Sequence, residues 1–494
     1  MKSIVPSSAC RVALVVAAAV AAAACVPREW LMPTLGLETP AFRDFGPGFK
    51  PPLSVETDQP ITGFGGNGGG VTRTPFVFVH GTTVSPSFWK GARAHFRELG
   101  YTDDELWAVG YGWNNGRYFD VDQLSAVTLD RFVTAMLTYL SEKEDRPVRQ
   151  LDMMGHSLGN TVIRHWVTQT NSWHKLRSFI GNSGVNHGSW ALTADVRGPN
   201  RAPGYELHRD SPWLKALNRA GETPGPTHYM TLYDGTGWGD IFYSPPYKDS
   251  PRLEGARNLA YNVEHGTLLD HLELGLAPGP LAAVLEFVRT GPEPTAGAEP
   301  PQILQEGAVL KTDQERALLF CAKGGAYPAV AAAGTDYPTV VTLGAPQVDL
   351  SDEELHTCFA QNTKTRLSSP MARFKYSEAP RSNEPLTLTA TPGGGVFEHP
   401  QRVTLKTSDP AAFIVYSTVT ADVNSGMPLY FEPVYVHAPL TLTAVAYAPD
   451  GRVTEPLKLQ FDISQELIDA RNTLQRQFDP SAPVEYAGRR KKGR

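Results

Sequence analysis

Residues 150–170 read QLDMMGHSLGNTVIRHWVTQT and join a short apolar run to an amphipathic one. The first part, residues 151–154, is typical of a buried strand. The second part has apolar side chains at helical spacing, namely Leu158, Val162, Ile163, Trp166 and Val167. The pattern predicts a strand that turns directly into a helix, with Ser157 at the corner.

The corner carries Gly155, Ser157 and Gly159, which form the only G-x-S-x-G pattern in the chain. A strand that reverses within one residue strains the backbone of the serine, and side chains two positions away on either side would collide with the strand and the helix. Ser157 is therefore held out as a candidate nucleophile, and the helix start offers N–H groups to an oxyanion. The alternative is an ordinary loop serine in a glycine-rich chain.

Strands and helices alternate around this corner. The apolar patterns predict strands at residues 76–79, 106–110, 178–184, 229–233 and 258–263, and helices at 88–99, 121–141 and 280–289. Such alternation implies a right-handed, doubly wound, mostly parallel sheet. Catalytic groups then belong at the carboxyl ends of its strands.

Residues 155–159, with His80 and Gly81 directly after the apolar run 76–79, resemble the α/β-hydrolase superfamily and, more narrowly, bacterial secreted lipases and esterases. We assign residues 74–290 to an α/β-hydrolase catalytic domain on this basis. The resemblance implies an oxyanion hole formed by the backbone N–H groups of Thr82 and Leu158. The alternative for the His-Gly pair is an ordinary tight turn.

The family order is serine, acid, histidine, and two aspartates follow the predicted strand 229–233. Asp240, a few residues past the strand and before Ile241, resembles the family's acid. Asp234 stands in an Asp-Gly pair and is interpreted as a turn residue.

The base is assigned in the same way. His271 lies before the final predicted helix, and residues 270–274, DHLEL, resemble the family's H-L-x-L ending. His265 is interpreted as a spectator, and His187, which precedes the acid, as a pocket or structural residue. The resemblance thus implies a triad of Ser157, Asp240 and His271 that needs no metal and no organic cofactor.

Residues 190–227 form a long excursion after the strand 178–184 and contain Pro203, Pro212 and Pro224. Such an insertion is either a cap that contacts the substrate or a surface loop.

The chain has 494 residues, 41% hydrophobic residues and a net charge of −6, so two or three domains with sizeable cores are expected. No basic stripe runs through its body, which gives nucleic-acid binding no support.

The N-terminus predicts export. Lys2 and Arg11 flank an apolar stretch at 12–24 whose length suits a signal peptide, which we place at residues 1–25. Cys25 and the preceding Ala22, Ala23 and Ala24 resemble a lipoprotein cleavage box. A lipidated Cys25 would anchor the protein in the cell envelope; an ordinary cut nearby would release it. Residues 26–73, rich in Pro and Gly, are predicted to be a flexible segment.

The C-terminal half divides by composition. Residues 291–306 are a predicted linker, and residues 307–383 a partly helical extension. The extension contains Cys321 and Cys358, an even pair that predicts one disulfide in an oxidising compartment. A metal site lacks further ligands.

Residues 384–463 show short alternating strands, among them 386–390, 403–407, 413–417 and 440–446, which predict a β-sandwich. Their order is similar to the immunoglobulin-like module of the chitobiase/β-hexosaminidase C-terminal type. The sequence leaves open whether this accessory domain contacts a polymer or a cell surface, or only stabilises. Residues 464–494 form a predicted tail with a basic end.

These features predict a secreted serine hydrolase that cleaves carboxylic esters or lipids. The rivals are an extracellular polyester depolymerase of the polyhydroxyalkanoate type, an acyltransferase, and a surface binding protein that has lost its chemistry on a hydrolase scaffold.

Overall fold

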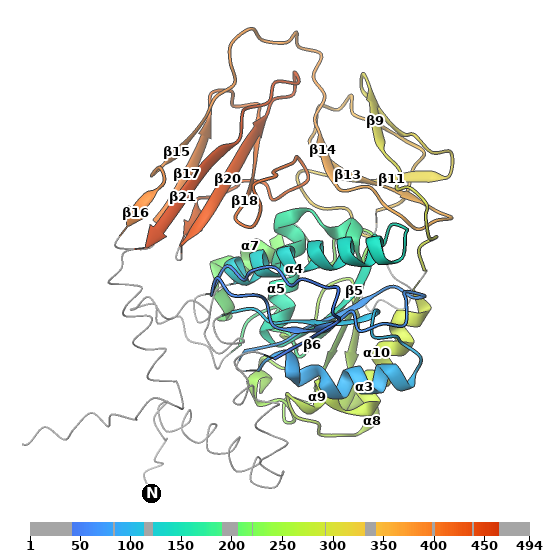
Figure 1. Ribbon diagram of the computed structural model, residues 1–494. Coiled ribbons are helices and arrows are strands. Elements are labelled where there is room, and N and C mark those ends of the chain that lie inside the picture. The colour runs from blue at the N-terminus through green and yellow to red at the C-terminus, as the bar shows by residue number, and fades with distance from the viewer. Residues whose placement is uncertain are drawn as a thin grey trace, which may run out of the picture.

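The computed structural model describes residues 42–463 apart from 83, 113–121, 190–205, 220, 292, 331–341, 398–400 and 437–438. The predicted signal peptide with Cys25, and the tail 464–494, lie outside the described residues. One large sheet with its helices forms the first part of the chain, and four smaller sheets follow it (Figure 1). No helix in the described ranges is long and apolar enough to cross a membrane.

The large sheet has eight strands in the order β1-β2-β4-β3-β5-β6-β7-β8. Their bounds are β1 Arg43–Phe45, β2 Gly63–Gly65, β3 Phe76–Val79, β4 Leu106–Val109, β5 Leu151–His156, β6 Leu176–Asn182, β7 His228–Tyr233 and β8 Arg257–Ala260. Every pairing from β4 to β8 is parallel, and only β2 pairs antiparallel to its neighbour β4. The expected mostly parallel sheet is therefore present.

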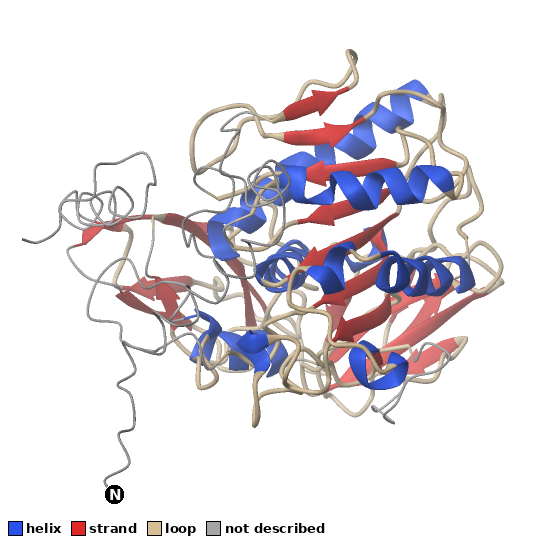
Figure 2. Ribbon diagram, turned by 90° about the horizontal axis from the view of Figure 1, so that it is seen from below, coloured by secondary structure: helices blue, strands red, loops and turns tan. Residues whose placement is uncertain are grey.

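Helices cover both faces of this sheet (Figure 2). On one face lie α4 Asp122–Lys143 and α5 Leu158–Thr170, and on the other α3 Lys90–Glu98, α9 Glu273–Leu276 and α10 Pro278–Thr290. Side chains of β3 alternate between two separate cores, because successive residues of a strand point to opposite faces. Val77 and Val79 join the core under α4 and α5, whereas Phe76 and Phe78 join the core under α3 and α10. The sheet is thus doubly wound.

The segment 26–73 differs from the expectation of a flexible approach, because its described residues add β1 and β2 to the sheet. A Cβ at Gly63 would lie 1.9 Å from the backbone oxygen of Ala108, and a Cβ at Gly65 would lie 2.4 Å from the ring of Trp107. These glycines therefore permit a close strand contact.

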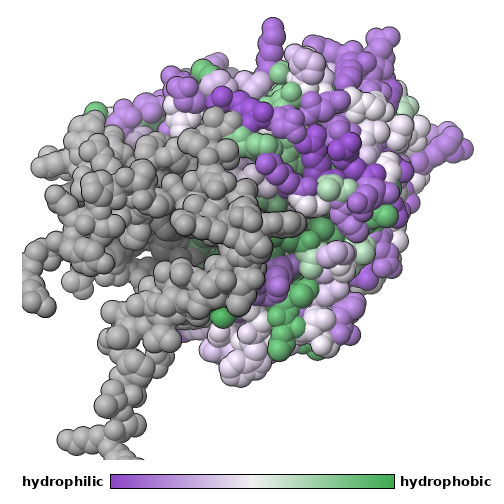
Figure 3. Space-filling view, turned by 60° about the horizontal axis from the view of Figure 1, so that its bottom comes forward, coloured by the Kyte–Doolittle hydropathy of each residue, from purple (hydrophilic) through white to green (hydrophobic). Residues whose placement is uncertain are grey.

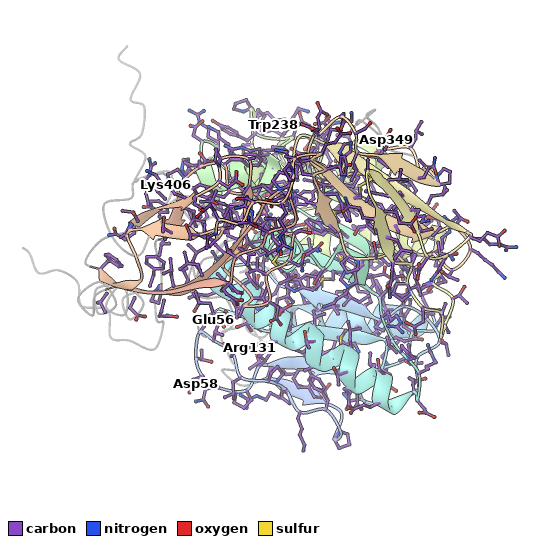
Figure 4. The ribbon with its side chains drawn as sticks, turned by 90° about the horizontal axis from the view of Figure 1, so that it is seen from above. Glu56, Asp58, Arg131, Trp238, Asp349 and Lys406 are labelled. Carbon is purple, nitrogen blue, oxygen red and sulfur yellow. A yellow bond between two sulfur atoms is a disulfide. The ribbon has the colours of Figure 1, made fainter. Side chains whose placement is uncertain are left out.

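The loop before β2 is also fixed to the domain. It lies along α4, where Glu56 and Arg131 are close together (Figure 4). Val55 N–H donates to Thr128 Oγ1 over 3.2 Å, and Arg131 Nη1 donates to the backbone oxygen of Leu53 over 3.0 Å. The described residues of this segment are therefore part of the domain built on the large sheet, and Ile61 and Phe64 belong to its core.

The prediction of helical stretches in residues 307–383 is wrong for the described residues, in which every regular element is a strand. These are β10 Val309–Thr312, β11 Ala317–Lys323, β12 Gln347–Asp349, β13 His356–Asn362 and β14 Ala372–Phe374, and β9 Ile303–Glu306 lies within the predicted linker. The segment ALLFCAK of β11 consists largely of good helix formers, but pairing with β13 overrides that local preference. Cys321 and Cys358 face each other in this pair and form a disulfide.

Residues 384–463, the C-terminal β-module, contain two sheets that share one apolar core. One sheet has the order β15-β17-β19 and the other β16-β21-β20-β18. Their bounds are β15 Leu388–Thr391, β16 Gly395–Phe397, β17 Gln401–Thr407, β18 Phe413–Ser417, β19 Val434–Val436, β20 Leu440–Tyr447 and β21 Leu457–Ile463. The family of this module stays a prediction.

The C-terminal parts pack on the end of α5 (Figure 1). Asn171 Nδ2 donates to the backbone oxygen of Met371 over 2.8 Å and to Asn424 Oδ1 over 2.7 Å. Ser417 Oγ donates to the backbone oxygen of Gln169 over 2.8 Å. The bonds with Met371 and Ser417 are buried and the bond with Asn424 is partly buried, so specific polar contacts join the C-terminal strands to α5.

Candidate active site

The corner between β5 and α5 consists of a single residue. Ser157 has φ 54° and ψ −120°, a conformation that a non-glycine residue adopts only under strain. A Cβ at Gly155 would lie 2.7 Å from the backbone nitrogen of Asn160, and a Cβ at Gly159 would lie 2.5 Å from the backbone oxygen of Val79. Both flanking positions therefore require glycine, as the pattern predicted.

The loop after β3 lies directly against this corner. A Cβ at Gly81 would lie 2.8 Å from Cβ of Ser157 and 2.9 Å from the backbone oxygen of His156. Thr82 is the next residue of that loop and is half-buried. Leu158 begins α5, and the first N–H groups of a helix have no acceptor within it. Gly81 and the start of α5 thus lie beside Ser157, and the oxyanion role of the Thr82 and Leu158 N–H groups stays a prediction.

The buried ring of His80 stabilises the same loop. Its ring is fully buried and stacks on Tyr111, with 4.3 Å between ring centroids and 6° between planes. Burial lowers the pKa of His80 to about 4, against a smaller opposite effect of its hydrogen bond with the backbone oxygen of Gly81. The ring is therefore neutral at pH 7.

Asp240 and His271 form a hydrogen-bonded pair. His271 Nδ1 lies 2.7 Å from Asp240 Oδ2, and Asp240 Oδ1 accepts a hydrogen bond from Phe242 N–H over 3.1 Å. The aspartate side chain is fully buried and that of His271 is 12% exposed. The carboxylate therefore fixes the ring with the proton on Nδ1, which leaves Nε2 as the basic nitrogen.

His156 connects this pair to the corner. Its Nε2 lies 2.8 Å from the backbone oxygen of His271, and the two rings are 4.7 Å apart. Because a carbonyl only accepts, Nε2 of His156 carries the proton. Burial, and then the neighbouring His271, hold the pKa of His156 well below its usual range. The residue before Ser157 is thus a neutral donor to the backbone of His271.

The structure brings the three predicted catalytic residues to one edge of the sheet, but it does not join all of them directly. Among the described residues, Ser157 Oγ makes no hydrogen bond to the ring of His271. Catalytic hydrogen bonds are often long without substrate and shorten when it binds.

The other candidates have structural contacts. Asp234 accepts hydrogen bonds from Thr236 Oγ1, Gly237 N and Asn262 Nδ2, each over 2.6 Å. Burial alone would raise the pKa of Asp234, but these donors outweigh it and lower the pKa. Asp234 therefore organises the loop that leads to Asp240.

Two histidines lie apart from this pair. His265 stacks on Tyr261 with 4.1 Å between ring centroids. His187 bonds through Nε2 to Glu222 over 2.7 Å and through Nδ1 to the backbone oxygen of Ser250 over 3.1 Å. Neither ring is bonded to Asp240, and the roles of both histidines stay predictions.

Sequence reasoning missed two residues that brace the corner. Asn160 Nδ2 donates to the backbone oxygens of Ser157 and Asn182 over 2.9 and 3.0 Å, and the N–H of Ser157 donates to the same oxygen of Asn182 over 2.9 Å. Asn160 is fully buried. Asn160 is one of several polar residues in α5, so its identity alone gave no signal for this role. His156 occupies a variable position of the motif, which carries no such signal.

The predicted cap at 190–227 is only partly within the described residues. Its described end includes α7 Pro212–Arg219, which packs on α5. Just before the predicted cap, Ser189 Oγ donates to the backbone oxygen of Phe242 over 2.9 Å. In the described ranges, no cluster of His, Cys, Asp or Glu could hold a metal ion.

Residues 73–234 match the family described as "Lipase (class 2)". The match covers about a third of the chain. No curated protein matches the chain. Among solved structures, the chain is similar to mature Bacillus licheniformis lipase BlEst2 at 16% identity and a TM-score of 0.36, over 46% of this chain and 97% of that one.

Two further structures are similar to this chain at 13% identity. The propeptide form of the Bacillus lipase aligns with 81% of this chain and 96% of its own length, with a TM-score of 0.35. The Pyrococcus furiosus esterase Pf2001 aligns with 48% of this chain and 90% of its own length, with a TM-score of 0.32. The family match and the parallel sheet support an α/β-hydrolase of the lipase and esterase kind.

Proposed function

We propose that this chain is a serine hydrolase that cleaves carboxylic esters through Ser157, His271 and Asp240. The observation that carries the proposal is the Asp240–His271 pair, which His156 ties to the corner at Ser157. A strained serine, a basic ring nitrogen and a buried carboxylate are the parts that nucleophilic acyl transfer requires.

In the proposed reaction, His271 Nε2 removes the proton of Ser157 as Oγ attacks the acyl carbon. The N–H groups of Thr82 and Leu158 stabilise the oxyanion, and Asp240 stabilises the charged ring. His271 then gives the proton to the departing alcohol, which leaves an acyl-enzyme. Water, deprotonated by the same nitrogen, attacks this ester, and the acid leaves while Ser157 regains its proton.

Large hydrophobic side chains near the triad support an apolar ester substrate. Trp238 is 77% exposed, and Phe242, which contacts the ring of His271 at 4.6 Å, is 37% exposed. Val263 and Leu268 are also exposed. Hydrophobic residues gather on the face that carries α8 Tyr261–His265 and α9 (Figure 3). Exposed apolar groups at a site favour substrates with acyl chains.

An active-site probe tests the proposal. A fluorophosphonate should label the wild-type protein and not Ser157→Ala, and that substitution should lower kcat on p-nitrophenyl esters by roughly 10⁴ to 10⁶. Equal labelling of both proteins, or a loss below about tenfold, would rule out Ser157 as the nucleophile. Rates across esters of increasing chain length would then define the acyl preference.

We also infer export, with cleavage near Cys25. The disulfide between Cys321 and Cys358 supports an oxidising compartment. Mass spectrometry of the mature N-terminus decides between a lipidated Cys25 and an ordinary cut, and an intact Met1 on cytoplasmic protein would contradict export.

A further inference from the structure

The two ring nitrogens of His80 face opposite kinds of backbone group. Nδ1 lies 2.9 Å from the backbone oxygen of Gly81, the next residue, and Nε2 lies 3.5 Å from the backbone nitrogen of Tyr111. A carbonyl oxygen only accepts and a backbone N–H only donates, so the neutral ring carries its proton on Nδ1. His80 therefore donates to Gly81 and accepts from Tyr111.

This hydrogen bond holds the backbone oxygen of Gly81 on one side of β3. The ring of His80 stacks on Tyr111, which lies two positions after the end of β4. The sheet order β4-β3-β5 places β4 and β5 on opposite sides of β3, and Ser157 directly follows β5. The oxygen of Gly81 is thus held toward β4, away from β5.

The N–H of Thr82 belongs to the same peptide unit as this oxygen. The unit is trans, since the cis bonds in the described ranges both precede proline. In a planar trans unit the C=O and the N–H point in opposite directions. The N–H of Thr82 is therefore directed toward the β5 side, and it has no acceptor among the described residues.

The corner at Ser157 lies close to the loop on that side. A Cβ at Gly81 would lie only 2.8 Å from Cβ of Ser157, so nothing larger than glycine fits between them. An oxyanion that forms on an acyl carbon bonded to Ser157 Oγ would lie beside this loop. Donors that are already aimed at such an oxygen need no reorganisation during the reaction. The direction of the peptide unit between Gly81 and Thr82 therefore matters for catalysis.

We propose that His80 is a positioning residue, which aims the N–H of Thr82 at the oxyanion through its own hydrogen bond to Gly81. The inference rests on the proposed ester hydrolysis and adds a residue whose buried ring does not touch the substrate. Without the Nδ1 donor, the peptide unit can rotate about its flanking bonds. The oxyanion exists only in the transition state and the tetrahedral intermediate, so the loss falls on kcat rather than on KM.

Two amide variants separate the roles of the two ring nitrogens. In His80→Asn the amide nitrogen takes about the place of Nδ1 and can donate to Gly81, whereas in His80→Gln the amide reaches the place of Nε2 and can only serve Tyr111. His80→Gln should lower kcat on p-nitrophenyl esters by roughly tenfold to a hundredfold and leave KM within about threefold. His80→Asn should keep kcat within about threefold of the wild type.

A transition-state analogue provides a measurement that a purely structural role of His80 would not change. Ser157 Oγ adds to the carbonyl carbon of octyl trifluoromethyl ketone, the serine proton passes to His271, and the former carbonyl oxygen becomes an oxyanion. The corresponding secondary alcohol binds without this step. In His80→Gln the inhibition constant of the ketone should rise by about the factor by which kcat falls, and that of the alcohol should stay within about twofold.

Equal kcat in the Asn and Gln variants, or a parallel loss of ketone and alcohol binding, would overturn the inference, because His80 would then only fill space in the loop. His80→Phe keeps a stacked ring without a donor and should match His80→Gln. The ratio of the two inhibition constants needs only one folded variant, so either of these suffices.

Ser157→Ala separates this result from the proposed function. If that variant is as active as the wild type, the proposed ester hydrolysis and the role of His80 both fail. If it is inactive while His80→Gln keeps the kcat of the wild type, only the role of His80 is excluded.

Discussion

His156 Nε2 donates a hydrogen bond to the backbone oxygen of His271, 2.8 Å away, although 115 positions separate the two residues. The bond crosses from β5 to the loop before α9 and leaves the ring of His271 free to contact Asp240. The backbone of His271, the proposed base, is therefore held by the side chain next to Ser157, the proposed nucleophile.

His156→Phe should disturb this position. The variant removes the donor and leaves the backbone oxygen of His271 without it, at a cost of about 1 to 3 kcal/mol. We expect kcat to fall by about tenfold to a hundredfold with little change in KM. His156→Gln, whose amide can donate, should retain more activity. Equal kcat for Phe, Gln and wild type would show that the bond does not position the base.

Asp240→Asn should change the tautomer of the His271 ring. An amide nitrogen facing Nδ1 favours the tautomer with its proton on Nε2, which cannot accept the serine proton. We expect kcat to fall by about 10⁴ with the fold intact by circular dichroism. Asp234→Asn is the control, because Asp234 bonds to its own loop, and it should keep kcat within about tenfold of wild type. The opposite ranking would assign the acid to Asp234.

Acid should destabilise the protein through His80. Its pKa is about 4 when folded and near the ordinary 6.5 when unfolded, so the unfolded chain binds the proton more tightly. The neutral ring of His80 contributes about 3 kcal/mol to the free energy of unfolding above about pH 6.5. This contribution is lost as the pH falls towards 4.

Urea unfolding across that pH range measures the effect. His80→Gln cannot titrate, so its free energy of unfolding should fall less between neutral pH and pH 4 than that of the wild type. An identical pH dependence in both proteins would contradict the assignment.

The disulfide should stabilise the chain through its unfolded state. Cys321 and Cys358 are 37 positions apart, and closing a loop of that length corresponds to about 4 kcal/mol. The double variant Cys321→Ala/Cys358→Ala should unfold at lower denaturant concentration. Reduction of the wild type should have the same effect but leave the double variant unchanged. A double variant as stable as the oxidised wild type would refute this role.

The corner at Ser157 could be predicted from sequence because its causes are local: an apolar run, helical spacing and two glycines without room for a side chain. Asp240 and His271 could be proposed only from the order of the family, since nothing near either residue encodes their contact. The packing of the C-terminal strands on α5 could not be predicted, because its hydrogen bonds join residues 200 or more positions apart.

The wrong predictions for the segments of β2 and β11 have the same physical cause. The glycines of β2 look like a flexible approach to the domain, but their missing side chains allow the contact with β4. The residues of β11 favour a helix locally, and only pairing with β13 makes them a strand. Partners distant in the chain decide both elements.

The contacts at the C-terminal end of α5 determine what a truncation of this chain would expose. Gln169 and Asn171 are 5% and 1% exposed and bond to residues 371, 417, 418 and 424. A shortened chain that stops at residue 290 would uncover these amides and the apolar surface around them. We therefore expect the shortened chain to aggregate more readily than the full-length protein.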